Sequence, residues 1–227
     1  MEDRVTPGLY LEMTDDPLDE YVAGRVVDLL AHPGVSRAAW WRNVNRHRVD
    51  LPRRIPEFDH LAVYEVDDRF GAPSTPDGVR GHLFHHYRRP GQGRLTGRPT
   101  LGLSLVLISP SEPHRAQELR DWGDFVHIRH IAEVAVPGYT MITPYENVTG
   151  QDPRYLHFYE MDTDEPEAAF GLMTPLVERL LNADRTRSVA RDQTVGVPPG
   201  DSFRRWASHD ALRIDYVNSF VRMGELA

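Results

Sequence analysis

The sequence predicts an α+β fold in which two copies of a β-α-β-β unit close into one barrel within a single chain. Three observations lead to this prediction. Short motifs recur in the same order in both halves, segments of alternating hydrophobicity flank segments of helical periodicity, and 40% of the residues are hydrophobic, as in a protein with a sizeable core. The two copies are expected to occupy residues 1–95 and 96–227.

Composition and charge exclude some classes of binding partner. The chain has 227 residues, no cysteine, and 26 Lys and Arg against 34 Asp and Glu, for a formal net charge of −8. An acidic surface repels polyanions, so we expect no nucleic-acid partner. The sequence contains no apolar run long enough to span a membrane and no signal-peptide pattern, which predicts a cytoplasmic protein without a membrane partner. Without cysteine, the chemistry has to come from His, Tyr, Arg and carboxylates, or from a bound cofactor.

The internal repeat is visible when the chain is laid on itself. Both copies contain a strand that ends in Tyr-Glu-x-Asp. A Pro-Gly turn precedes this strand, and a strand with alternating Leu lies further upstream. The matched segments are Gly8–Met13 with Gly102–Leu107, His32–Val35 with Val136–Tyr139, and Phe58–Asp67 with Arg154–Asp162. Three matches in register favour duplication over chance.

The first copy begins with the strand at 8–13. A helix follows over about 17–30 and ends at Pro33-Gly34, and the next strands are expected at about 35–43 and 58–67. Residues 69–78 hold too much Pro and Gly for a full helix, so the second helix of this copy is expected to be lost or reduced to one turn. A fourth strand over 81–87 and a linker over 88–100 complete the copy.

The second copy keeps both helices. Helical spacing of apolar residues predicts the first over about 111–134 and the second over about 166–181, where Pro175 should kink or shorten the helix. Residues 182–202 are expected to form a long loop, and 211–220 the closing strand.

The order of elements in each copy is that of a ferredoxin-like unit, an antiparallel sheet with helices on one face. The other face of such a sheet is apolar and has to be covered. A second copy of the same sheet is the simplest cover, which predicts two ferredoxin-like repeats that form an intramolecular α+β barrel.

The segment Trp122–Ala132, followed by Val136–Tyr139, resembles the aromatic-His-Pro-Gly pattern of EthD-like proteins in the dimeric α+β barrel superfamily. The resemblance covers most of the chain as a pattern, although the motif itself is short. It implies a small-molecule cavity between sheet and helices. Members of the superfamily include isomerases, polyketide cyclases, cofactor-free monooxygenases and haem enzymes, so the resemblance does not select one reaction.

Strand alternation nominates the first candidate site residues. Along 155–161, His157 and Tyr159 share one face while Leu156 and Phe158 share the other. The apolar pair is expected to face the helices, so His157 and Tyr159 are expected to line the cavity. Tyr64 is the counterpart of Tyr159 in the first copy.

Histidines outside that strand are further candidates. His82 and His86 share one face of the fourth strand and His85 lies on the other, so at least one His is expected to point inward. His127 and His130 lie three residues apart on one helix face, where they suit a proton shuttle, a metal-ligand pair or only a partly exposed surface. A metal would need a third ligand that the spacing does not require, so no metal site is predicted.

The leading functional hypothesis is an enzyme without a bound cofactor, of the isomerase, cyclase or lyase type, acting on a small apolar or aromatic carbonyl compound or polyketide-like substrate. His130, His157 or His86 would remove a proton, with His127 nearby, and Tyr159 or Tyr64 would donate a hydrogen bond to the oxyanion. One alternative is a haem-dependent or cofactor-free monooxygenase, since tandem barrels of the chlorite-dismutase type bind haem through a His of the second half. The other is a non-catalytic small-molecule-binding or stress-response module. A homodimer is left open beside a monomer.

Overall fold

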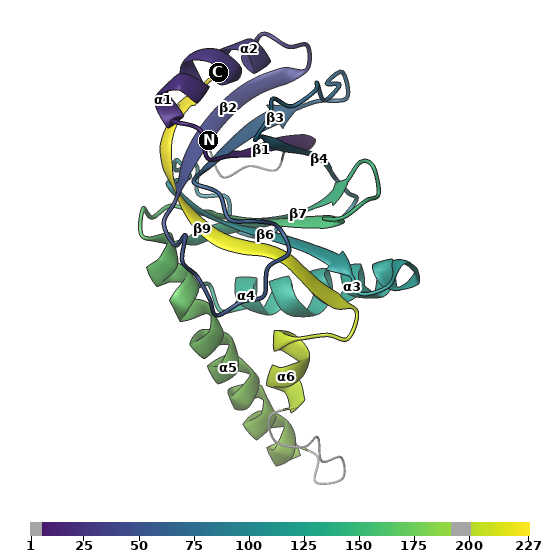
Figure 1. Ribbon diagram of the computed structural model, residues 1–227. Coiled ribbons are helices and arrows are strands. Elements are labelled where there is room, and N and C mark those ends of the chain that lie inside the picture. Colours follow the sequence, from purple (N-terminus) through teal and green to yellow (C-terminus); the bar gives the residue numbers. More distant parts are fainter. Residues whose placement is uncertain (1–5, 192–200) are drawn as a thin grey trace.

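The computed structural model describes residues 6–191 and 201–227, and its strands close into an antiparallel barrel with helices packed on the outside (Figure 1). The elements of the first copy and the linker are β1 (Gly8–Thr14), α1 (Leu18–Tyr21), the π-helix η1 (Val22–Val26), α2 (Val27–Leu30), β2 (Val35–Asn43), β3 (His60–Val66), β4 (Arg80–His86) and the short β5 (Gln92–Gly93). The elements of the second copy are β6 (Gly102–Pro110), the 3-10 turn η2 (Pro113–Arg115), α3 (Ala116–Trp122), the π-helix η3 (Gly123–Ile128), α4 (Arg129–Glu133), β7 (Tyr139–Asn147), β8 (Tyr155–Met161), α5 (Pro166–Arg191), α6 (Asp201–Ala207) and β9 (Leu212–Leu226).

The two copies have the same strand order. The first sheet runs β4-β1-β3-β2 and the second runs β9-β6-β8-β7, with each strand antiparallel to its neighbour. Pairing of β2 with β9 and of β4 with β7 joins the sheets at both edges. This order confirms the predicted fold class, two ferredoxin-like repeats that form one barrel.

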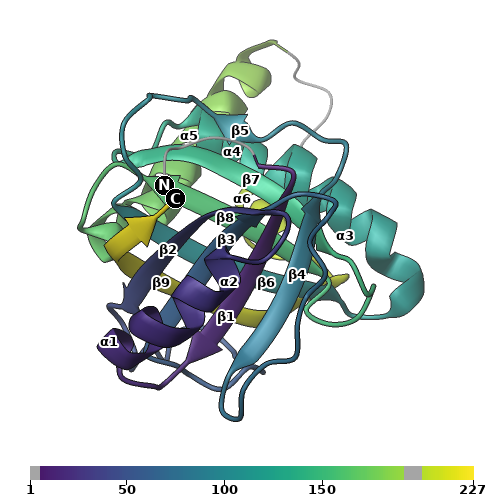
Figure 2. The same ribbon diagram turned by 90° about the horizontal axis from the view of Figure 1, so that it is seen from above.

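Helices cover the outer face of each sheet. Helices α1 and α2 lie over the first sheet, whereas α3, α4, α5 and α6 lie over the second, on the opposite side of the barrel (Figures 1 and 2). As predicted, no helix follows β3 in the described part of the first copy. The second sheet therefore has the thicker helical cover.

One turn is repeated in both copies because its backbone geometry requires glycine. Gly34 and Gly138 both have a φ of 88°, in the region that residues with a side chain avoid. The carbonyl of Gly34 accepts a hydrogen bond from the Asp67 amide at 2.9 Å, and Gly138 does the same for Asp162 at 2.9 Å. These bonds fasten the helix-to-strand turn to the end of the Tyr-Glu-x-Asp strand in each copy.

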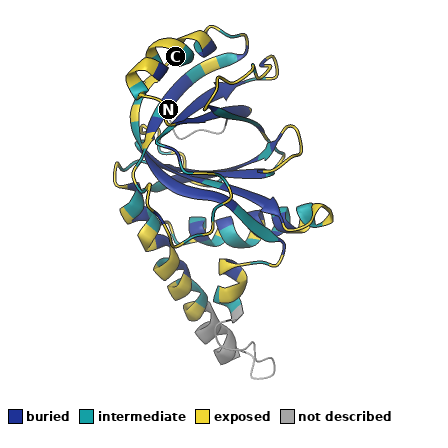
Figure 3. Ribbon diagram, in the orientation of Figure 1, coloured by how far each residue is buried: buried dark blue, intermediate teal, exposed yellow. Residues whose placement is uncertain are grey.

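The interior of the barrel is filled mainly by apolar side chains from both sheets, and β1, β3, β6, β7 and β8 are buried along most of their length (Figure 3). Leu156 and Phe158 belong to this interior, while His157 and Tyr159 face the helices. The predicted alternation is therefore right, but the expectation that the apolar pair faces the helices is wrong. The physical reason is that the closed barrel excludes water more completely than the helical layer, so Leu156 and Phe158 point inward.

The end of the second copy differs from the prediction. Helix α5 continues through Pro175 to Arg191 rather than ending near 181, and α6 begins at Asp201, so most of the predicted loop over 182–202 is wrong. Residues 192–200 of that loop lie outside the described residues. The closing strand β9 is also longer than expected, at 15 residues. Among the helices of the described residues, none combines the length and apolar character that a membrane span requires.

Candidate functional site

A cavity of about 240 Å³ lies between the second sheet and its helices. It is mostly apolar, and its described lining includes a single carboxylate, that of Asp50. The lining residues are Asp50 and Leu51 from the β2–β3 loop, Ser104, Val106 and Ile108 from β6, Trp122 and His127 from the first helical segment, His157 and Tyr159 from β8, Phe170, Met173 and Thr174 from α5, Trp206 and Ala207 from α6, and Leu212, Ile214 and Val217 from β9.

The cavity occurs in the second copy because two positions carry small or neutral residues there. Ser104 pairs with Tyr159 in the second sheet as Tyr10 pairs with Tyr64 in the first. The next outward position along the strand is Val106 in the second copy and Glu12 in the first. Tyr10 and Glu12 fill space that Ser104 and Val106 leave empty.

In the first copy this space holds a network around a buried carboxylate. Glu12 is fully buried and accepts hydrogen bonds from Tyr10 Oη at 2.9 Å, from Arg25 Nη2 at 2.6 Å and from Tyr21 Oη. The Tyr64 hydroxyl lies 3.3 Å from that of Tyr21. Burial, followed by the charge of Glu12, raises the pKa of Tyr10. Because every group has a partner, this layer is a packed core rather than a ligand site.

His157 is the most unusual polar group in the cavity. Its side chain is buried, with 2% of its surface exposed, and neither ring nitrogen makes a hydrogen bond with the part of the chain that the structure describes. Burial, with a smaller contribution from His127, lowers the pKa of His157 to about 3. The ring is therefore neutral at ordinary pH, with one nitrogen as donor and the other as acceptor. Buried groups of this kind usually meet a water molecule or a ligand.

Tyr159 supplies a second polar group of the same kind. It is 2% exposed, lines the cavity, and its hydroxyl makes no hydrogen bond with the described residues. Burial raises the pKa of Tyr159 well above its usual value, so the hydroxyl stays protonated and can donate. Tyr139 packs edge-on against it at 5.9 Å between ring centroids.

His127 is held between two indole rings. Trp122 lies 5.1 Å and Trp206 5.0 Å from it, measured between ring centroids, and the Trp206 ring is nearly parallel to the imidazole. Its Nδ1 lies 3.0 Å from the Trp206 carbonyl oxygen, and the Trp206 indole donates back to the His127 carbonyl at 3.0 Å. Burial lowers the pKa of His127 to about 4. This ring is a rigid wall of the cavity rather than a free base.

The π-helix η3 brings the helical layer close to His157. A Cβ at Gly123, the first residue of η3, would lie 3.0 Å from His157 Cε1 and 3.3 Å from Nε2. The first copy has a π-helix at the corresponding place, η1, and π-turns are rare and often occur at functional sites. Glycine at this position allows the helix backbone to contact the imidazole directly.

The structure brings three of the six predicted site residues together: His127, His157 and Tyr159. His130 is turned onto its own helix, with Nδ1 2.6 Å from the Val126 carbonyl oxygen. His86 faces the barrel interior, edge-on to Tyr145 at 5.7 Å. Tyr64 lies in the packed layer of the first copy. The cavity therefore does not include His130, His86 or Tyr64.

Sequence reasoning missed residues that reach the cavity from distant parts of the chain. Trp206 belongs to α6, which the sequence pattern did not predict, and Asp50 and Leu51 belong to a loop of the first copy. The aromatic Phe203 and Trp206, three residues apart, were the available signal for α6, since this spacing places both on one helix face.

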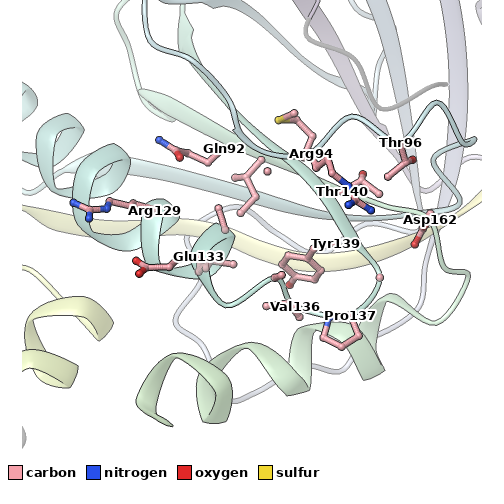
Figure 4. Close-up of a pocket in the computed structure, with 17 residues that line it drawn as sticks. Gln92, Arg94, Thr96, Arg129, Glu133, Val136, Pro137, Tyr139, Thr140 and Asp162 are labelled. Carbon is pink, nitrogen blue, oxygen red and sulfur yellow. The ribbon is translucent and has the colours of Figure 1, made fainter. Parts of the chain in front are cut away.

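A larger groove, of about 690 Å³, opens at the edge of the second sheet beside β5 (Figure 4). Arg129 and Glu133 lie at one end of it and Thr96 and Asp162 at the other. Its lining contains long surface side chains and the turn between α4 and β7, and none of the predicted site residues. The smaller cavity, with its buried polar groups, is the better candidate for chemistry.

Cofactor binding can be tested against the cavity's shape and lining. Within the described ranges, no three His, Asp or Glu side chains gather as metal ligands. A haem is at least as large as the ligands that occupy pockets of ~300–1,000 Å³, whereas this cavity is about 240 Å³ and has no Arg or Lys in its described lining to hold the propionates. The residues present therefore do not fit a haem.

No protein-family model matches the sequence, and no curated protein matches it. Solved structures do resemble the fold. A protein from Fusobacterium nucleatum provisionally named a monooxygenase has a TM-score of 0.51 at 6% identity, with 97% of this chain and 94% of that chain covered. One of the same description from Lactobacillus acidophilus has a TM-score of 0.51 at 10% identity, with 97% and 96% covered. An anthrone oxidase-like protein has a TM-score of 0.53 at 11% identity, with 100% and 95% covered. These similarities show that the chain has the fold of the dimeric α+β barrel proteins along its whole length.

Proposed function

We propose that this protein is a cofactor-free oxygenase that acts on a small, neutral aromatic compound in the cavity of the second copy. The observation that carries the proposal is the pair His157 and Tyr159, two buried polar groups without hydrogen-bond partners among the described residues, in a cavity with apolar walls. Such a pair suits a substrate that has one ionisable oxygen on an aromatic ring. The described lining has no Arg or Lys that could pair with an anion, which disfavours an anionic substrate.

The reaction begins with a proton transfer. His157 accepts the proton of a phenol or of a carbon next to a carbonyl, and Tyr159 donates a hydrogen bond to the resulting oxyanion. Burial is the main cause of the low pKa of His157. An adjacent anion favours the charged imidazolium, so the two charges form together as an ion pair.

Oxygen then reacts with the electron-rich anion. One electron passes from the anion to O2, and the two radicals combine at a ring carbon to form a peroxide anion. The imidazolium returns its proton to this anion, and the hydroperoxide then loses water, made from its outer OH group and the hydrogen of that ring carbon, to leave a carbonyl. For 1-naphthol the balance is one naphthol and one O2 giving one 1,4-naphthoquinone and one water. The apolar walls exclude bulk water from the anion, which strengthens the interactions with His157 and Tyr159.

The fold supports this oxygenase hypothesis over the isomerase, cyclase or lyase hypothesis, because the structures of similar fold include two provisionally named monooxygenases and an anthrone oxidase-like protein. The proton-transfer step is common to both hypotheses, and it uses the same two side chains. The experiment therefore has to measure oxygen and the proton separately.

The test compares oxygen uptake with hydrogen exchange. Purified protein is incubated with 1-naphthol or anthrone, and oxygen consumption and quinone formation are followed with an electrode and by absorbance. The same compounds are then incubated without oxygen in deuterated water. Quinone formation that disappears in His157→Ala supports the proposal. Deuterium exchange without oxygen uptake would instead identify an isomerase or cyclase, and recovery of unchanged compound in both assays would identify a binding module.

A further inference from the structure

The loop between β2 and β3 of the first copy reaches the cavity of the second. We infer that residues 44–55 of this loop, here named the strap, hold Asp50 and Leu51 in the wall of that cavity and so set the size of ligand that it accepts, with Arg48 as the residue that fastens the strap. The inference uses the proposed ligand cavity but does not depend on the reaction that takes place there.

The strap runs along β9. The Val44 amide donates to the Ser219 carbonyl at 3.1 Å, and further on the amides of Arg54 and Ile55 donate to the Asp215 carbonyl at 2.9 and 3.1 Å. The strap therefore follows the strand from its middle toward its start, on the side where α5 lies (Figure 1). Between these two attachments the strap crosses from β9 to α5, which Asn45 and Arg48 contact.

Arg48 holds the strap against α5 at the centre of this crossing. Its side chain is 3% exposed and pairs with Glu167, near the start of α5. Asn45 donates to the other carboxylate oxygen of Glu167 at 2.9 Å. The guanidinium also lies 4.7 Å from the ring centroid of Phe170. A buried arginine that is paired and stacked is a specific fastening, unlike the exposed ion pairs of a surface loop.

Two of the residues that Arg48 contacts also line the cavity. Asp50, which accepts from Arg48 at 3.1 Å, lines the cavity together with the adjacent Leu51. Phe170, which Arg48 covers, lines it from α5. Arg48 thus holds strap and helix together at the point where the two contribute wall residues.

The two copies differ in this loop. Residues 44–59 connect β2 to β3, whereas only residues 148–154 connect the corresponding strands β7 and β8. The long loop lies in the copy whose own outer layer is packed, and it serves the copy that has the cavity. The cavity is therefore incomplete without the first copy.

The experiment measures size selection with two neutral probes, 2-naphthol with two fused rings and 2-anthrol with three. Dissociation constants are obtained from quenching of tryptophan fluorescence, because Trp122 and Trp206 line the cavity. The variants are Arg48→Ala, which releases the strap, and Leu51→Ala, which shortens its wall residue. The matched control is Arg46→Ala, since Arg46 pairs with Asp15 and Asp59 of the first copy and not with α5.

We expect the native protein to prefer 2-naphthol and both strap variants to shift the ratio of the two dissociation constants toward 2-anthrol by about tenfold, the discrimination that a hydrophobic pocket gives for a small change in size. The exchanged pair Arg48→Glu with Glu167→Arg should restore part of the native ratio, and Arg46→Ala should leave it unchanged. A merely structural role of Arg48 would weaken both probes equally. An unchanged ratio in Arg48→Ala and Leu51→Ala, with the variants folded by circular dichroism, would overturn the inference, even if oxygen uptake supported the proposed reaction.

Discussion

The Tyr159 hydroxyl makes no hydrogen bond with the described residues, so its removal should separate binding from stability. In Tyr159→Phe we expect the free energy of unfolding to stay within ~0.5 kcal/mol of the native value, because no hydrogen bond to a described residue is lost. Binding of 2-naphthol should weaken about tenfold, the effect of losing one hydrogen bond to the ligand. Urea unfolding and fluorescence quenching measure the two quantities.

Tyr64 is the matched control, since it occupies the corresponding position in the first copy and its hydroxyl lies 3.3 Å from that of Tyr21. Tyr64→Phe should lose about 1 kcal/mol of stability and bind 2-naphthol normally. The opposite pattern, with a stability loss in Tyr159→Phe and normal binding, would assign the Tyr159 hydroxyl to the core rather than to a ligand.

The pKa of His157 makes a prediction about stability and pH. In the unfolded chain a histidine titrates near 6.5, whereas burial lowers the pKa of His157 to about 3 in the folded protein. The unfolded state therefore binds the proton first, so folding loses stability as the pH falls from about 6.5 toward 3, and there is no effect above that window.

Replacing the imidazole should remove this dependence. Between pH 7.5 and pH 5, the free energy of unfolding of His157→Gln should fall by ~2 kcal/mol less than that of the native protein, the value for one proton bound only in the unfolded state. Urea unfolding at the two pH values measures the difference. Equal losses in both proteins would mean that His157 is charged or solvated in the folded state.

The predictable part of the site consists of residues whose position depends on strand alternation. His157 and Tyr159 could be assigned to one face of a strand because successive side chains alternate. Which face meets the helices depends on how fully each layer excludes water, a property of the closed barrel. His86 and His130 could not be placed from spacing, because their orientation is set by Tyr145 on the paired strand β7 and by the Val126 carbonyl.

The π-helix η3 determines how closely the helix backbone approaches His157 in the cavity. Gly123→Ala places a Cβ 3.0 Å from His157 Cε1, so the imidazole has to move. We expect weaker binding of 2-naphthol, by about tenfold for a displaced polar contact, although alanine raises helix propensity by ~1 kcal/mol. The affinity for 2-naphthol, measured by fluorescence quenching, should therefore fall, while the free energy of unfolding, measured in urea, should rise.

The first copy offers the control for this substitution. Gly24 lies in η1, and a Cβ at Gly24 would meet nothing within 4 Å. Gly24→Ala should share the gain in helix propensity and leave binding unchanged. If both variants bind 2-naphthol normally, then the close approach of η3 to His157 has no role in ligand binding.

Elements were predictable where a local pattern decides them and not where tertiary contacts do. The repeat, the strands and the first helix of each copy follow from alternation, helical spacing and Pro-Gly ends. Helix α5 passes Pro175 and α6 forms despite weak local signals, since α6 packs Trp206 against His127. The strap has no periodic pattern at all, because its path is fixed by hydrogen bonds to β9.

In the whole molecule, the outer layers of the two copies differ in structure. The first copy has a buried Glu12 held by Arg25 and two tyrosines, and the second has the cavity at the corresponding place. Glu12→Ala should lower the free energy of unfolding by about 3–5 kcal/mol, because it leaves the partly buried Arg25 without its carboxylate.

Folded Glu12→Ala should still bind 2-naphthol with the native dissociation constant, since the network lies on the other side of the barrel from the cavity. Urea unfolding gives the first quantity and fluorescence quenching below the unfolding transition gives the second. A binding constant that changed along with stability would show that the two outer layers are coupled through the barrel.

Strand β9 follows every other strand in the sequence, yet it joins the two sheets by pairing with β2 on one side and β6 on the other. During synthesis on the ribosome, the edges of β2 and β6 that pair with β9 therefore remain unpaired until residues 212–226 have emerged. Open strand edges invite pairing with other chains. A chaperone or a neighbouring nascent chain therefore has access to both edges for a long interval. The interval ends only when β9 pairs with β2 and β6.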